Sequence, residues 1–132
     1  MKVMLDHNLS HLMAKALAEL FRGKHEIFAL KDLFPVNTPD RVWMEELSKQ
    51  DRWVFISGDR RITKNRTERE AFNRSRLIGF FLAPGLYKSS PIKQMERILA
   101  QWEVIENQFS IVKGSAAFEL QAKGLRLTQI KA

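Results

Sequence analysis

The stretch Trp-Val-Phe-Ile-Ser-Gly-Asp, residues 53–59, decides the fold. Its first four residues are apolar and of types that favour strands, and an acid follows after a short turn. A continuous apolar run of this kind is typical of a central strand in a parallel sheet, because such a strand is buried on both faces. Ser57, Gly58 and Asp59 then mark its carboxyl end. The stretch therefore predicts an α/β protein whose central strand ends in a carboxylate.

The first thirty residues predict a βαβ unit. Residues 2–5 form a short predicted strand that ends at Asp6, and Asn8 is expected to cap the helix that follows. Gly23 is expected to end this helix, and residues 25–30 to form a second strand reached by a right-handed crossover. The apolar residues of the helix recur at helical spacing and predict one face packed on a sheet. They are Leu9, Leu12, Met13, Ala16, Leu17, Leu20 and Phe21.

A second helix is predicted between the second strand and residue 53. Residues 34–38 are expected to form a loop, with Thr38 as the N-cap and Pro39 at the first helical position. Asp40 then lies in the first turn, where a negative charge interacts favourably with the helix dipole. We expect the helix to run to about Gln50.

The second half of the chain continues the alternation of helices and strands. Thr67 and Glu70 have the capping-box spacing of a third helix, residues 77–82 read as a buried strand, and residues 83–90 as a loop. Pro91 opens a long helix with one apolar face. That face contains Ile92, Met95, Leu99, Trp102, Ile105 and Phe109.

The tail changes to a period of two on either side of Lys123 and Gly124, which predicts a β-hairpin. Such a hairpin covers either this sheet or that of a second copy. The whole pattern predicts a three-layer α/β/α doubly wound, mostly parallel sheet with a C-terminal β-hairpin. We expect one domain, in which residues 1–110 form the main fold and residues 111–132 a strand or hairpin extension.

Composition restricts the class of protein. The chain has 132 residues, 45% of them hydrophobic, no cysteine and a net charge of +7. No apolar run approaches the length of a membrane span, and we expect a cytoplasmic protein.

The excess of bases favours a polyanionic partner, and it is concentrated after Asp59. The predicted RNA-binding residues are Arg60, Arg61, Lys64 and Arg66.

Three acids, Asp6, Asp40 and Asp59, follow predicted strands or lie in the first turn of a helix. In an open parallel sheet these positions converge on one crevice at the carboxyl ends of the strands. Carboxylates placed together raise one another's pKa unless a cation compensates them, and hard divalent ions prefer oxygen ligands. The three acids therefore predict a Mg²⁺ or Mn²⁺ site and metal-dependent cleavage of phosphodiester bonds.

Several segments together resemble the PIN-like domain of VapC-type toxins. They are Val-Met-Leu-Asp-His-Asn-Leu-Ser at residues 3–10, Thr-Pro-Asp at residues 38–40 with Trp43 following, residues 53–59, and Lys-Asn-Arg-Thr-Glu at residues 64–68. The resemblance spans about residues 1–110. It implies a PIN-like fold and a Mg²⁺- or Mn²⁺-dependent ribonuclease. Such proteins are often the toxin half of a toxin–antitoxin pair and often homodimers, so a cognate antitoxin is the expected partner.

The resemblance also implies roles for single residues. Asp6 corresponds to the acid after the first strand, Asp40 to the acid that opens the second helix, and Asp59 to the acid after the third strand. Glu68 is the weakest match and is either a fourth catalytic acid or a structural residue. Asn8 and Ser57 are candidates for orienting the acids or a metal-bound water, although helix capping explains Asn8 equally well.

Two departures leave alternatives open. Many relatives carry an acid where this chain has His7, and another where it has Arg61. One alternative is therefore a PIN-like module that binds RNA or protein without cutting, or cuts weakly. Another is a phosphoacceptor receiver domain with Asp59 as the phosphorylated residue, but Ala83 stands where that fold has a hydroxyl residue. Simple helix or turn roles also account for Asp6, Asp40 and Asp59 taken singly.

Overall fold

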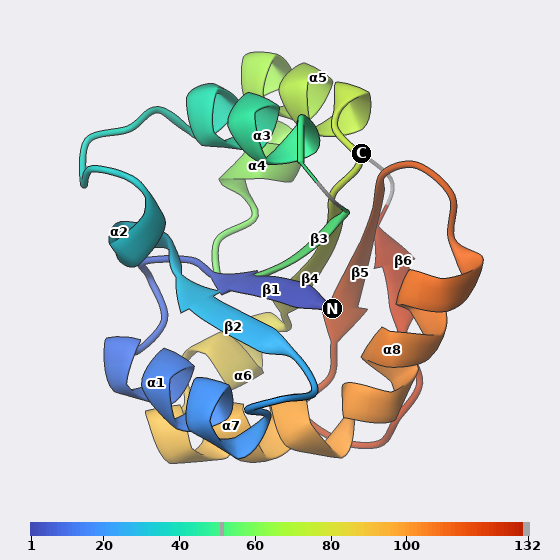
Figure 1. Cartoon of the computed structure of the whole chain (residues 1–132). Coiled ribbons are helices and arrows are strands. Elements are labelled where there is room, and N and C mark those ends of the chain that lie inside the picture. The colour runs from blue at the N-terminus through green and yellow to red at the C-terminus, as the bar shows by residue number, and fades with distance from the viewer. Residues whose placement is uncertain (51, 131–132) are drawn as a thin grey trace.

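The computed structural model describes residues 1–50 and 52–130 and contains a six-stranded sheet in the order β2-β1-β3-β4-β5-β6 (Figure 1). The strands from β2 to β5 pair in parallel, and β6 is antiparallel to β5. The strands are β1 Lys2–Leu5, β2 Glu26–Ala29, β3 Trp53–Ser57, β4 Ile78–Leu82, β5 Ala116–Leu120 and β6 Thr128–Ile130. The predicted doubly wound, mostly parallel sheet is confirmed.

The helices cover both faces of the sheet. Figure 1 shows α3, α4 and α5 on one side and α1, α6, α7 and α8 on the other. The helices are α1 His11–Leu20, α2 Leu30–Leu33, α3 Asp40–Ser48, α4 Arg61–Lys64, α5 Arg66–Arg74, α6 Pro84–Tyr87, α7 Pro91–Ala100 and α8 Trp102–Ile111. No helix among the described residues is both long and apolar enough to cross a membrane.

Two apolar cores lie on the two faces of the sheet because side chains alternate along each strand. Val54 and Ile56 belong to the core that includes Leu17 of α1, whereas Phe55 belongs to the core that includes Trp43 of α3. Every residue of β3 is buried. The prediction of a central strand buried on both faces is therefore confirmed.

Strand order reverses between β1 and β3, since β2 lies on one side of β1 and β3 on the other. Leu5 is in register with Ile56, and the Asp6 N–H donates to the Ile56 carbonyl at 2.9 Å. The two strands therefore end side by side. In open α/β sheets this switch point is where a crevice forms beyond the carboxyl ends of the strands.

The first helix differs from its prediction at both its cap and its face. Its N-cap is Ser10, whose hydroxyl accepts from the Met13 N–H at 3.3 Å, and not Asn8. Leu12 and Leu20 are 74% and 61% exposed, and Ala16 is exposed as well. The residues of α1 that face the core are Met13, Ala14 and Leu17. The spacing predicted a broader apolar face because it could not distinguish the sheet-facing stripe from apolar residues beside it.

The second helix starts later than predicted. Pro39 occupies the N-cap position with extended backbone, so Asp40 is the first helical residue. The Thr38 hydroxyl, predicted to cap the helix, donates instead to the Pro35 carbonyl at 2.7 Å and closes a turn. The helix ends at Ser48, and the predicted second strand is shortened by α2.

The predicted capping box of the third helix is wrong. Asn65 is the N-cap of α5, and its side-chain oxygen accepts from the N–H groups of Thr67 at 3.1 Å and Glu68 at 3.3 Å. Glu70 lies one turn after Arg66 in α5, and its carboxylate pairs with Arg66 Nε at 3.2 Å instead of closing a capping box. The short helices α4 and α6 were not predicted, because single helical turns carry too few residues to show a period.

The predicted long helix is two helices, α7 and α8, separated at Gln101. The buried Gln101 amide donates to the Arg97 carbonyl at 2.9 Å and to the Gln121 carbonyl at 3.0 Å. Its oxygen accepts from the Gln121 N–H at 3.0 Å, which ties this junction to the end of β5. Ile92, predicted on the apolar face, is exposed, and Ile98 is buried.

The C-terminal hairpin is confirmed as the antiparallel pair β5 and β6. It extends the sheet of the chain itself, since β5 also pairs in parallel with β4. Its second strand starts at Thr128, so Leu125 and Leu127 belong to the connection and Leu125 is exposed.

Candidate active site

Asp6 lies at the end of β1 and is almost fully buried, with 7% of its surface exposed. One carboxylate oxygen, Oδ2, accepts from Ser57 Oγ at 2.8 Å and from Asn8 Nδ2 at 3.3 Å. The other, Oδ1, accepts from the His7 N–H at 2.7 Å and lies 2.9 Å from His7 Nδ1. These contacts fix the orientation of the carboxylate at the switch point.

Asn8 joins the ends of the two central strands. Its Nδ2 donates to Ser57 Oγ at 3.2 Å as well as to Asp6, and its Oδ1 accepts from the Gly58 N–H at 3.1 Å. Of the two interpretations of Asn8, helix capping is excluded and its contact with the acid is observed. Ser57, its neighbour in this network, also accepts from the Asp59 N–H at 3.0 Å.

Burial raises the pKa of Asp6 above its ordinary value of 3.8, because the charged form loses its hydration. The hydrogen bond from Ser57 and the neighbouring His7 oppose this shift, while the charge of Asp40 adds to it. The charge of Asp40, which belongs to a different segment, thus disfavours the ionised form of Asp6. The ionised form of Asp6 is thus stabilised by any cation that reaches it.

Asp59 follows β3 and is held by Arg61 through both carboxylate oxygens. Oδ1 accepts from the Arg61 N–H at 2.9 Å, and Oδ2 accepts from Arg61 Nε at 2.5 Å. The carboxylate of Asp59 raises the pKa of Arg61. The charges of Asp40 and Glu68 act in the same direction. Arg61 therefore provides the positive charge beside these acids.

Asp40 and Glu68 approach each other from α3 and α5. Asp40 Oδ1 accepts from Nε1 of the buried Trp43 at 3.0 Å. Burial raises the pKa of Glu68, and the charge of Asp40 and a hydrogen bond between the two side chains raise it further. Asp59 contributes in the same direction. All four predicted acids are thus linked through charge interactions.

The donor chemistry of these acids fits a hard divalent cation. All ligands on offer are carboxylate oxygens, and Glu68 Oε2 is buried with no hydrogen-bond partner among the described residues. Within residues 1–50 and 52–130, however, no three His, Asp or Glu side chains are arranged as a closed metal-holding group. Arg61 contacts both oxygens of Asp59, Oδ1 through its backbone N–H and Oδ2 through Nε.

The predicted RNA-binding bases are partly engaged within the protein. Arg60 forms an ion pair with Glu119 of β5, and Arg61 is bound to Asp59. Arg66 pairs with Glu70 on the exposed surface of α5, and Lys64 is exposed. Arg60 and Arg61 therefore contact acids near the ends of the strands, whereas Lys64 and Arg66 lie farther along the chain, in α4 and at the start of α5.

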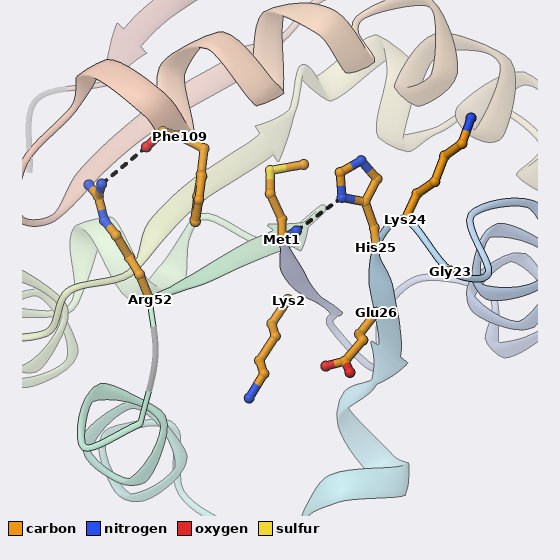
Figure 2. A pocket seen from close by; sticks show the side chains of 8 residues that line it. All are labelled: Met1, Lys2, Gly23, Lys24, His25, Glu26, Arg52 and Phe109. Carbon is orange, nitrogen blue, oxygen red and sulfur yellow. Dashed lines mark hydrogen bonds between the residues drawn. The ribbon is translucent and has the colours of Figure 1, made fainter.

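The largest cavity lies at the opposite end of the sheet. Its volume is about 570 Å³, and its lining includes Lys2, Glu26 and Arg52, which lie at the amino ends of β1, β2 and β3 (Figure 2). Arg52 donates to the Phe109 carbonyl at 3.1 Å, and the side chains of Lys2 and Lys24 extend in opposite directions in Figure 2. A smaller cavity of about 120 Å³ is lined by Asp6 and residues around it. Position at the carboxyl ends, and not cavity size, identifies the candidate site.

Comparison with known families identifies the family of the domain. A family model described as a PIN like domain matches residues 1–84, which is more than half of the chain. The chain therefore belongs to the PIN-like domain family, whose members are in general nucleases that use divalent metal ions. The comparison with curated proteins gave no match, and neither did the comparison with solved structures. The matched segment contains Asp6, Asp40, Asp59 and Glu68.

Proposed function

We propose that this protein is a metal-dependent endoribonuclease and the toxin component of a toxin–antitoxin pair. The observation that carries the proposal is the set of four acids, Asp6, Asp40, Asp59 and Glu68, which come from separate segments of a PIN-like domain and perturb one another. Such a set is unfavourable unless a cation compensates it. We take residues 1–110 as the nuclease and residues 111–132 as its sheet extension, acting in the cytoplasm.

Asp6, Asp40 and Asp59 are the proposed ligands of Mg²⁺ or Mn²⁺, and Glu68 is the fourth acid. A bound divalent ion supplies charge neutralisation at the phosphate and makes water more acidic. Asn8 and Ser57 keep Asp6 in one orientation through neutral donors, so no reorganisation is needed when the ion arrives. For Asp59 to bind the ion through Oδ2, the Arg61 side chain must move away from that oxygen, whereas Oδ1 accepts only from the Arg61 backbone N–H.

RNA is the proposed substrate because the chain carries a net charge of +7 and places bases around the acids. Lys64 and Arg66 are exposed and suited to contact phosphates on the side of α5. Arg61 is suited to move from Asp59 to a phosphate when the metal binds, since a guanidinium binds both groups through the same donors. Arg60 is held by Glu119 and borders the same region.

A second candidate function is a PIN-like module that binds RNA or a protein without cutting. It is favoured by the contacts of His7 with Asp6 and of Arg61 with Asp59, which place cationic or cation-forming groups on two proposed ligands. In this case Arg61 permanently replaces the metal at Asp59. The protein would then bind RNA with a strong dependence on salt and leave it intact.

The test is cleavage of total cellular RNA by the purified chain in manganese, with a chelator arm and with Asp6→Asn and Asp59→Asn. The ribonuclease proposal predicts fragments that require both the metal and the two acids. A chain that binds RNA but yields no fragments in manganese or magnesium supports the binding module. An equal yield of fragments in the presence of the chelator would contradict both the metal dependence of cleavage and the assignment of the acids as metal ligands.

The toxin role is tested separately, by inducing the chain in a bacterial host and recording growth. The wild-type chain is expected to arrest growth, and Asp6→Asn at equal abundance is expected to allow it. A small gene adjacent to this one is the expected source of an antitoxin, and its co-expression should restore growth. If the host grows normally although the chain cleaves RNA in vitro, the proposed nuclease activity holds and the proposed toxin role is wrong.

A further inference from the structure

Tyr87, at the end of α6, packs directly on the backbone of the candidate site. A Cβ atom at Gly58 would lie 2.1 Å from Tyr87 Cδ1 and 2.2 Å from Tyr87 Cε1, which is impossible for real atoms. Gly58 stands between Ser57 and Asp59, and its N–H is bound by Asn8. The ring therefore adjoins the peptide unit that connects the two ends of the acid network.

A buried polar side chain holds the backbone of Tyr87. The Tyr87 carbonyl accepts from Nε2 of Gln94 at 2.9 Å, and Gln94 of α7 is only 6% exposed. The same amide donates to the Ser89 carbonyl at 3.3 Å, and the Tyr87 N–H donates to the Ala83 carbonyl at 2.9 Å. Because a buried amide is costly unless bonded, these contacts fix the segment that carries the ring.

Part of the ring nevertheless remains open to solvent. Tyr87 is 38% exposed, and Lys88, the next residue, is exposed as well. An aromatic ring that is fixed on one side and open on the other, beside a basic residue, is the arrangement with which proteins stack the bases of single-stranded RNA. The hydrogen bonds among Asp6, Asn8 and Ser57 do not involve the Tyr87 side chain.

We propose that Tyr87 is a base-stacking residue of the RNA site. A nucleobase next to the phosphate that faces Asp6 and Asp59 stacks on the open part of the ring, and Lys88 contacts the neighbouring backbone. The absence of a side chain at Gly58 is what allows the ring to lie this close to the backbone between Ser57 and Asp59. This inference rests on the proposed function, because it assigns the substrate contact of the same site.

The test compares wild type, Tyr87→Phe and Tyr87→Leu in binding a short single-stranded RNA in the presence of a chelator. Stacking predicts that Tyr87→Phe binds as wild type does and that Tyr87→Leu binds about 5- to 100-fold more weakly. On an abasic oligonucleotide of equal charge, the wild-type and Tyr87→Leu proteins should have the same affinity. Ile92→Ala, which truncates an exposed apolar residue of α7, is the control and should bind normally.

Gly58→Ala provides a second variant, because the added methyl must displace the ring. It should weaken RNA binding as Tyr87→Leu does, and thermal unfolding of each variant checks that the fold is retained. Equal affinity of Tyr87→Leu and wild type for RNA overturns the inference, as does an equal loss on the abasic chain.

The same measurements separate this inference from the proposed function. If the wild-type chain cleaves RNA but Tyr87→Leu is unaffected in binding and in KM, only the stacking role is wrong. If the wild-type chain binds RNA in a Tyr87-dependent way and cuts nothing, the stacking role holds and the nuclease is wrong. A wild-type chain that neither binds nor cleaves RNA contradicts both.

Discussion

Asp6 and Asp59 follow adjacent central strands, yet the protein compensates their charges in different ways. Asp6 is 7% exposed and is bound by Ser57, Asn8 and His7, whereas the Asp59 side chain is 27% exposed and held by the Arg61 guanidinium. Burial raises the pKa of Asp6, while Asp59 raises that of Arg61. The difference shows that a guanidinium compensates the charge of Asp59, whereas burial leaves the ionised form of Asp6 unfavourable.

The largest expected effect tests whether Asp6 is the central ligand. Asp6→Asn should lower kcat/KM for RNA by more than about 100-fold, since even the hydrogen-bond partners of metal ligands commonly contribute about 10- to 100-fold. It should also abolish the rise in Tm that manganese gives the wild-type chain. Asp32→Asn, at an exposed acid that pairs with His11, is the matched control and should change neither quantity. Wild-type activity in Asp6→Asn would remove Asp6 from the site.

The next prediction tests the neutral donors around Asp6. Asn8→Ala should lower kcat/KM by about 10- to 100-fold, because it removes a donor to the carboxylate and the bridge to Gly58. Ser10→Ala removes the cap of α1 instead and should lower the free energy of unfolding by about 1 kcal/mol with kcat unchanged. The pair thus separates loss of the site from loss of stability. Equal kcat values for Asn8→Ala and wild type would contradict the orienting role.

A smaller effect is expected at Asp59. Arg61→Ala should strengthen manganese binding by about 2- to 5-fold, because it frees Oδ2 of Asp59 from an exposed pair of modest strength while the backbone N–H of residue 61 still donates to Oδ1. Arg61→Lys keeps the positive charge, so its manganese affinity should lie between those of the wild type and Arg61→Ala. Metal affinity is measured by calorimetry without RNA, so that any loss of an RNA contact does not interfere. Weaker metal binding by Arg61→Ala would show that Arg61 supports the site.

The smallest effect concerns stability. Because folding raises the pKa of Asp6, the folded chain binds more protons than the unfolded chain while the pH rises from the unfolded to the folded pKa, and ionised Asp6 then costs stability that is fully present above the folded pKa. Without metal, Asp6→Asn should therefore raise Tm by about 2–6 °C at neutral pH and by progressively less as the pH falls towards 3.8. A Tm difference that is independent of pH, measured from pH 3 to 8 in a chelator, would contradict this assignment.

Sequence spacing predicted which segments contribute to the candidate site, but not the hydrogen-bond partners of their polar side chains. Thr38 and Thr67 were predicted as N-caps, yet the caps are Pro39 and Asn65. Asn8 was an equally plausible cap of α1, but its amide is used by Ser57 and Gly58, some fifty residues away in the chain. A polar side chain near a helix start has several partners within reach, and the choice depends on what the fold brings beside it.

What the sequence alone determined is the α/β class and the placement of Asp6, Asp40 and Asp59 at the ends of their elements. These features depend on burial and backbone preference over a few neighbouring residues, so they can be read locally. The tertiary structure decided that Arg61 binds Asp59, that Asn8 bridges β1 and β3, and that Tyr87 lies on Gly58. The Asn8 and Tyr87 contacts, in particular, form only when strands and helices distant in sequence meet at the carboxyl edge of the sheet.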